Sequence, residues 1–217
     1  MLNRASLSEG LRFLAGQDED LKRVLLQYGR PPLWARRPGF PTLLRIILEQ
    51  QVSLASAQAA FNRLAQAIGP ITPRRFLLMD DERLLQIGFS RQKKRYVRLL
   101  AEDILSGRFD LAGLVEMDDA EVREAMLKIK GVGDWSVDIY LLMALRRPDV
   151  WPKADLALMT AAQKVKGLAQ RPSVDDMQAL GEAWRPWRAV AARILWHYYL
   201  SSRALSRLKI TTVNGIS

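Results

Sequence analysis

The sequence contains no cysteine and only one histidine, His197. The absence of cysteine excludes disulfides, thiolate zinc sites, cysteine nucleophiles and an iron–sulfur cluster held by cysteines. A single histidine leaves little room for a histidine-based metal site or for a general acid–base pair. Any chemistry must therefore depend on carboxylates, lysines, hydroxyls or the backbone.

Long apolar runs and alternating strand patterns are also missing. No apolar stretch approaches the roughly 20 residues that a membrane helix needs, and the N-terminus lacks the apolar segment of a signal peptide. We therefore expect a soluble intracellular protein. Apolar residues still make up 49% of the chain, and their helical spacing predicts an all-α fold with a sizeable core.

Acidic residues are the scarcer charged class. The 33 lysines and arginines exceed the 23 aspartates and glutamates and give a net charge of +10. This excess favours a polyanionic partner, nucleic acid before membrane. A basic protein without such a partner is the alternative, and composition alone does not separate the two.

Helical segments with capping residues follow one another along most of the chain. A proline-rich connector occupies residues 30–41, since prolines lack the amide that a helix interior needs. The last strong helical segment runs from Trp184 to Leu205, and residues 208–217 are expected to form a tail.

Two glycines flank a valine in the turn Gly131-Val132-Gly133, which joins two predicted helices. Glycines permit positive φ and expose backbone amides, and the following helix adds the positive end of its dipole. Such a turn can bind phosphate without reading the base sequence, and Lys128 and Lys130 add charge beside it. An ordinary helix–helix turn is the alternative.

Four stretches in order resemble the helix-hairpin-helix DNA glycosylases, in the branch of 3-methyladenine DNA glycosylase II. They read ILEQQVSLASA, GFSRQKKRYVRLLA, LKIKGVGDWSVDIYLLMALRRPDVWPKADLAL and WRPWRAVAARILW. The resemblance covers about residues 40–200. It implies one glycosylase domain over 1–217, without the extra N-terminal domain of longer bacterial members.

The resemblance also implies two helical lobes with the active cleft between them. The expected lobes are residues 44–150, with the hairpin at 119–145, and residues 1–43 together with 151–217.

Asp155 matches the catalytic aspartate of that family and stands 22 residues after Gly133. Taken by itself it is expected to cap a helix, and the two roles are compatible because a helix N-terminus favours a carboxylate. The implied reaction is hydrolysis of the N-glycosidic bond of flipped-out alkylated bases in duplex DNA. Bifunctional relatives carry a lysine where this chain has Trp135, so we expect an abasic site and no strand cleavage.

The resemblance assigns the base pocket to Trp135, Trp196, Ile139 and Leu156. The best-known bacterial pattern has tyrosines at the last two positions, so this pocket is expected to be less aromatic. Trp184 and Trp187 are expected to be structural, with Arg188 as a contact between the lobes. Core packing is the alternative role for each tryptophan.

The motif that includes Gln51 and Ser53 matches the loop that fills the gap left by a flipped base, with Gln51 as the wedge. A glutamine at a helix end is the alternative. A basic face that could contact phosphates is expected on the helix from Ser90 to Leu105, although a solvated helix face is the usual explanation and is slightly favoured for each residue taken alone. Its members are Arg91, Lys93, Lys94, Arg95 and Arg98.

The expected partner is double-stranded DNA, with no membrane, no obligate protein partner and no cofactor. No side-chain metal site is expected, and the resemblance allows a monovalent cation on the backbone of residues 128–133. The protein would act in the bacterial cytoplasm at the nucleoid, or in a eukaryotic nucleus. Two alternatives stay open: a glycosylase of the same fold for deaminated or oxidised bases, and a non-catalytic DNA-binding protein.

Overall fold

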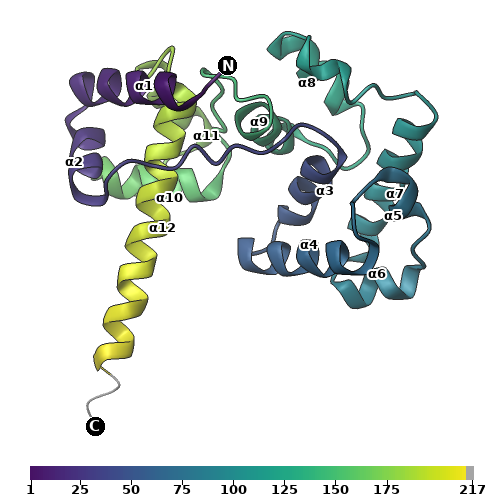
Figure 1. Ribbon diagram of the computed structural model, residues 1–217. Helices are drawn as coiled ribbons and strands as arrows, with labels where there is room; N and C mark the ends of the chain where they lie inside the picture. Colours follow the sequence, from purple (N-terminus) through teal and green to yellow (C-terminus); the bar gives the residue numbers. More distant parts are fainter. Residues whose placement is uncertain (214–217) are drawn as a thin grey trace. The chain divides into compact units, whose positions relative to one another are not determined.

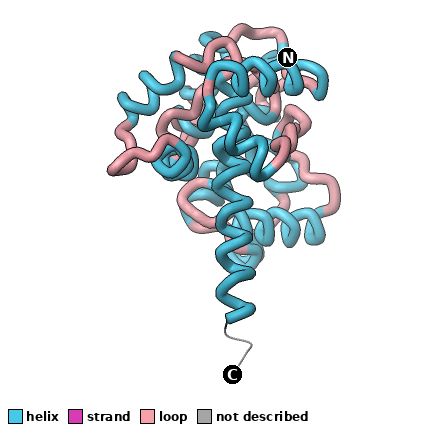
Figure 2. The backbone as a smooth tube through the Cα atoms, turned by 90° about the vertical axis from the view of Figure 1, so that its left-hand side faces the viewer, coloured by secondary structure: helices cyan, strands magenta, loops and turns pink. Residues whose placement is uncertain are grey.

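The computed structural model describes the backbone of residues 1–213 and the side chains of residues 1–204. Within this part of the chain every regular element is a helix, and no strand occurs (Figures 1 and 2). The predicted all-α fold is confirmed. None of the helices described is long and apolar enough to cross a membrane.

The chain divides into two compact units. Unit 1 comprises Met1–Trp34 and Arg146–Ser217, and unit 2 comprises Ala35–Leu145. The helices of unit 1 are α1 (Arg4–Gln17), α2 (Glu19–Tyr28), α10 (Leu156–Val165), α11 (Val174–Glu182) and α12 (Arg188–Val213). Those of unit 2 are α3 (Phe40–Glu49), α4 (Leu54–Ile68), α5 (Pro73–Leu77), α6 (Asp81–Ile87), α7 (Arg91–Leu105), the 3₁₀ turn η1 (Gly113–Val115), α8 (Asp119–Leu127) and α9 (Asp134–Met143).

Unit 2 is built around α3. Eight of the ten residues of this helix are buried, as expected for a helix that is apolar on most of its sides. It packs against α4, α7 and α9. Its last residue, the buried Glu49, accepts hydrogen bonds from Arg36 at 2.8 and 2.9 Å and from Arg45 at 3.1 Å. These ion pairs compensate the cost of burying the carboxylate.

Unit 1 is built around the first half of α12, where residues 189–196 are all buried. This helix packs against α1, α2 and α10 (Figure 1). Arg193 lies in its middle with no exposed surface and donates to the carbonyl of Leu33 at 2.9 Å and to that of Ala189 at 2.7 Å. Burial lowers the pKa of Arg193 to about 10, so the guanidinium stays charged at neutral pH.

The unit boundaries differ from the lobe boundaries expected from the sequence. Both expected breaks, after residues 43 and 150, fall earlier in the structure. Residues 35–41 of the connector belong to unit 2, where the Arg36 amide donates to the Met143 carbonyl at 2.9 Å. Arg146 belongs to unit 1, where its carbonyl accepts from the Leu2 amide at 2.6 Å.

The expected tail at residues 208–217 is wrong for its first part. The backbone of α12 continues as a helix to Val213, and residues 214–217 lie outside the described residues. Once a helix is formed, each further residue adds a hydrogen bond at little cost. No proline or glycine interrupts the chain between Arg188 and Val213.

Asp18 ties three helices of unit 1 together. Its carboxylate caps α2, accepts from the Lys166 ammonium at 2.7 and 2.8 Å, and accepts from the Trp184 indole at 2.8 Å. Burial alone would raise the pKa of Asp18, but the hydrogen bonds from Lys166, Trp184 and the Leu21 amide together hold it below the ordinary value of 3.8. The negative charge at this position is therefore stabilised by folding.

Replacing Asp18 by asparagine is expected to lower the free energy of unfolding at pH 7 by about 1.5–3 kcal/mol, the range for a hydrogen bond to a charged group. A folded-state pKa below the unfolded value gives stability that is present above pH 3.8 and is lost as the pH falls through the folded pKa. The difference in the free energy of unfolding between wild type and Asp18→Asn should therefore become smaller as the pH is lowered. Urea denaturation from pH 7 to pH 3 measures it, and a pH-independent difference would contradict this account.

Candidate active site and nucleic-acid interface

Asp155 ends the loop of residues 146–155 and is the N-cap of α10. Its Oδ1 atom accepts from the Leu158 amide at 2.9 Å and from the Trp196 indole Nε1 at 3.1 Å. The residue is only 8% exposed. Both donors and the positive end of the α10 dipole stabilise negative charge at this oxygen. A carboxylate in such surroundings is suited to stabilise positive charge that develops on a ligand.

Trp196 was predicted as an aromatic residue of the base pocket, and the structure adds its hydrogen bond to Asp155. Its ring contacts Trp34 edge-on, with centroids 6.5 Å apart and an interplanar angle of 75°. Trp34 has φ +47°, which is strained for a bulky residue. The buried Arg193 holds this segment through the neighbouring Leu33 carbonyl. The contact of Trp34 with Trp196 was not predicted from the sequence, because helical periodicity gives no information about the partners of a residue in a connector.

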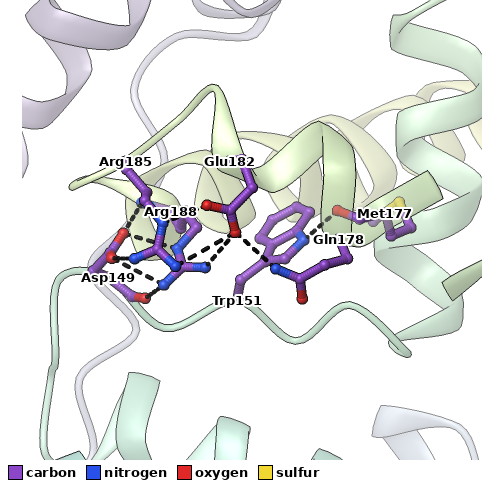
Figure 3. A network of polar contacts seen from close by, with 7 residues as sticks. All are labelled: Asp149, Trp151, Met177, Gln178, Glu182, Arg185 and Arg188. Atoms are coloured by element: carbon purple, nitrogen blue, oxygen red, sulfur yellow. Dashed lines mark hydrogen bonds and ion pairs between the residues drawn. The ribbon is translucent and has the colours of Figure 1, made fainter. Parts of the chain in front are cut away.

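A polar network fixes the loop that carries Asp155 (Figure 3). Arg188 donates to Asp149 Oδ1 and Oδ2, each at 2.9 Å, and Arg185 donates to Oδ2 at 2.7 Å. Glu182 accepts from both arginines. All four residues belong to unit 1. The expected boundary after residue 150 places Asp149 and Arg188 in different lobes, whereas the observed boundary places both in one unit.

Trp151 anchors the same loop from within the core of unit 1. Its indole donates to the Met177 carbonyl at 2.7 Å (Figure 3). Its ring also packs edge-on against Trp184, with the ring centroids 5.2 Å apart. A Cβ on Gly181 would overlap this indole, which explains the glycine in α11. The contacts of Trp151 thus fix the backbone of the loop a few residues before Asp155.

In unit 2, α8 and α9 form the two helices of the predicted hairpin. Arg123 of α8 pairs with Asp134 at 2.9 Å and with the buried Asp138, both on α9. Burial alone would lower the pKa of Arg123, but its ion pairs with Asp138 and Asp134 raise it overall. Ile129 and Val132 are 5% and 6% exposed and attach the turn to the core.

The two glycines of the turn have different structural reasons. Gly131 has φ +88°, and a Cβ there would overlap the ring of Tyr96 on α7. Gly133 has φ −114°, and a Cβ there would meet no atom within 4 Å. Gly131 is therefore required by conformation and packing, whereas Gly133 leaves the surface in front of α9 open.

Gly133 is the N-cap of α9 and supplies no side-chain hydrogen bond, so the first amides of the helix face outward without a side-chain cap. The Val132 amide donates to the Ile129 carbonyl at 3.1 Å. The Val132 amide is therefore used within the turn. We propose that an anion would contact the neighbouring amides of Gly131 and Gly133 instead.

Several residues of the predicted basic face have structural partners. Lys94 and Arg98 pair with Asp81, and Lys93 donates to the carbonyls of Leu48 and Gln50. Burial lowers the pKa of Lys93. The exposed members of this face are Arg91 and Arg95.

Beside the hairpin, Lys130 is exposed. Lys128 is also exposed and pairs with Glu124 at 2.9 Å, one helical turn earlier. A surface pair of this kind contributes little to stability, so Lys128 can exchange Glu124 for a phosphate at small cost.

The turn of residues 50–53 joins α3 to α4, and we call it the gap turn. Gln51 in this turn is exposed and has φ +56°. Val52 is 46% exposed. Ser53 is the N-cap of α4, and its hydroxyl accepts from the Ser56 amide at 3.1 Å. The predicted wedge residue thus stands at the surface on a strained turn.

The remaining predicted pocket residues occupy two helices. Trp135 is half-buried in the first turn of α9, and Ile139 is 2% exposed one turn later on the same face. Leu156 is 63% exposed at the start of α10. The structure therefore joins Asp155 and Trp196 by a hydrogen bond in unit 1, while Trp135 and Ile139 follow the hairpin in unit 2. Among the described residues no group of three His, Cys, Asp or Glu side chains is arranged for a metal ion.

Residues 44–186 match the family model of the HhH-GPD superfamily base excision DNA repair proteins. YfjP of Bacillus subtilis is 27% identical over 184 residues, which are 81% of this chain and 64% of YfjP. The chain thus spans less than two thirds of that relative. DNA-3-methyladenine glycosylase 1 of Schizosaccharomyces pombe is 30% identical over 198 residues, which are 88% of this chain and 87% of the relative.

A solved structure agrees with these sequence comparisons. The 3-methyladenine DNA glycosylase Mag1 of Schizosaccharomyces pombe, in complex with abasic DNA, has a TM-score of 0.77 to this chain at 28% identity. The alignment covers 87% of this chain and 95% of that chain.

The different roles of the two glycines lead to a paired prediction. Gly131→Ala should lower the free energy of unfolding by about 2–4 kcal/mol, because it combines a left-handed alanine with overlap of Tyr96. Gly133→Ala should leave stability within about 1 kcal/mol and still weaken binding to duplex DNA, because its methyl group occupies the surface at the α9 N-terminus. Thermal unfolding and fluorescence anisotropy measure the two effects, and unchanged affinity in the stable Gly133→Ala would contradict an anion site there.

Proposed function

Because the chain belongs to the HhH-GPD superfamily of base excision DNA repair proteins, we propose that it is a monofunctional DNA glycosylase for alkylated bases. It acts on 3-methyladenine and 7-methylguanine in duplex DNA and leaves an abasic site. The observation that carries this proposal is the buried Asp155 carboxylate, held by Leu158 and Trp196. Phosphate binding alone would require no carboxylate at this position.

The reaction needs a group that stabilises positive charge on the sugar. The C1′–N bond breaks with its electron pair leaving on the base, and oxocarbenium character develops on the deoxyribose. The Asp155 carboxylate stabilises that charge and accepts a proton from the water that adds to C1′. An alkylated purine is already cationic, so the electron pair neutralises it and no general acid is needed.

The single histidine is consistent with chemistry that lacks a general acid. His197 Nε2 lies 2.8 Å from the Tyr28 carbonyl, a contact between α12 and α2. The imidazole thus has a structural partner away from Asp155, and we assign it no catalytic step.

Recognition of the base follows from its charge. A flipped-out cationic base gains about 0.5–2 kcal/mol from contact with an aromatic face, which offsets part of the few kcal/mol that flipping costs. Trp196 is bonded to the catalytic carboxylate and offers such a ring, and Trp135 offers another beside the hairpin. An indole at position 135 has no amine to form a Schiff base, so the abasic strand stays intact.

The test is release of methylated bases from alkylated duplex DNA by wild type and Asp155→Asn. Asparagine is an equally good N-cap, so its fold is retained, and we expect base release to slow by about a hundredfold or more, the scale of losing an electrostatic stabiliser. Asp80→Asn is the matched control, since it removes the same charge from the N-cap of α6.

Three results would contradict the proposal. Equal rates in wild type and Asp155→Asn would remove the catalytic assignment of Asp155. Strand breaks without heat or alkali would contradict the monofunctional mechanism. Faster release of a deaminated or oxidised base than of 3-methyladenine would contradict the alkylated-base specificity.

A further inference from the structure

The strained gap turn requires support, because a glutamine with φ +56° costs free energy that neighbouring contacts must offset. Two sets of hydrogen bonds hold Gln50, the residue just before Gln51: one is made by Lys93 and the other by the side chain of Gln50 itself. The Lys93 ammonium donates to the carbonyls of Leu48 and Gln50, each at 2.7 Å. These carbonyls lie at the C-terminal end of α3, where helix carbonyls lack partners within the helix. Lys93 therefore fixes the backbone on which the turn begins.

The side chain of Gln50 makes the second attachment. Its amide Nε2 donates to the Gly131 carbonyl at 2.9 Å and to the Ser136 hydroxyl at 2.8 Å. A glutamine amide has two N–H bonds, and both are used here. Gly131 lies in the hairpin turn, and Ser136 lies in the first turn of α9 with 2% exposure. One side chain thus joins the gap turn to the hairpin turn and to the helix α9 that follows it.

Gln50 reaches the hairpin through the Gly131 carbonyl, whereas the groups that we expect to meet phosphate are backbone amides. Gln51 is the exposed residue of the gap turn, and Gly133 leaves the surface open at the hairpin. In unit 2, α3 also packs directly against α9 (Figure 1). The hydrogen bonds of Gln50 therefore fix the position of the gap turn relative to the hairpin. Such a fixed arrangement would let both surfaces bind the same duplex together.

We propose that Gln50 is a positioning residue that couples the hairpin to the gap turn, so that phosphate binding at the hairpin directs Gln51 into the space left by a flipped base. The inference rests on the proposed function and deepens it. Hairpin contacts strengthen binding to any duplex, whereas the coupling strengthens binding only where a base has left the stack. Loss of Gln50 should therefore reduce discrimination between the two kinds of duplex while leaving general affinity.

The test compares the affinity for an undamaged duplex with that for the same duplex carrying a tetrahydrofuran abasic analogue. Gln50→Met keeps the size and neutral charge of the side chain and removes both donated hydrogen bonds. We expect it to lower the preference for the abasic duplex about tenfold and to change affinity for the undamaged duplex by less than about threefold, the scale of losing hydrogen bonds. Gln178→Met, which removes a surface bond to Glu182 on α11, should change neither.

A double-mutant cycle with Gln51→Ala separates coupling from a local effect. If Gln50 acts through Gln51, Gln50→Met should lower the preference little further once Gln51 is alanine. Independent, multiplying effects would overturn the inference. An equal loss of affinity for both duplexes would also overturn it, because Gln50 would then support only the hairpin.

Ser136→Ala provides a milder variant that removes one of the two acceptors and keeps a good helix former in α9. It should lower the preference about threefold, and it carries the test if Gln50→Met does not fold. Binding is measured without base release, so a protein that discriminates the abasic duplex but releases no base would contradict the proposed function alone. A wild type with no preference for the abasic duplex would overturn the inference itself.

Discussion

The hydrogen bonds that hold the Asp155 carboxylate at the start of α10 are the constraint on which the rest of unit 1 depends. A carboxylate that is 8% exposed needs donors, and the Leu158 amide and Trp196 indole supply them. The amide comes from a helix N-terminus, so the loop before α10 must end at a fixed place. Asp149 and Trp151 fix that loop through ion pairs and core packing. The indole comes from the buried first half of α12, which places a rigid aromatic donor on Asp155 Oδ1.

Unit 2 carries the two features that we propose to meet DNA, the backbone of the hairpin and the side chain of Gln51 in the gap turn. Gly131 lets the hairpin turn lie against Tyr96, and Gly133 leaves the N-terminus of α9 uncovered. Part of the basic helix α7 is used inside the unit, since Lys93 bonds the end of α3. A lysine whose charge satisfies carbonyl groups is not available to DNA in the same way as an exposed one. Counting basic residues therefore overstates the phosphate-binding surface of this helix.

Much of this could be predicted from the sequence because it depends on local patterns. Helical periodicity and capping residues predicted the all-α fold and an N-cap at Asp155, and the resemblance to the glycosylase family implied the role of that carboxylate. What could not be predicted depends on contacts distant in sequence. The side chain of Gln50 donates to residues of the hairpin that lie 81 and 86 positions away. The ring contact of Trp34 with Trp196 and the ion pair of Arg188 with Asp149 are equally beyond prediction, because periodicity does not say which partner a side chain meets.

The central claim is that Asp155 stabilises positive charge at the sugar. The most direct measurement compares affinities for a duplex carrying a cationic pyrrolidine abasic analogue and for one carrying the neutral tetrahydrofuran analogue. The wild type should bind the cationic analogue at least about tenfold more tightly, since an opposite charge a few ångströms away is worth more than 1.4 kcal/mol at a partly buried site. Asp155→Asn should bind both alike. The same preference for the cation in both proteins would contradict the account.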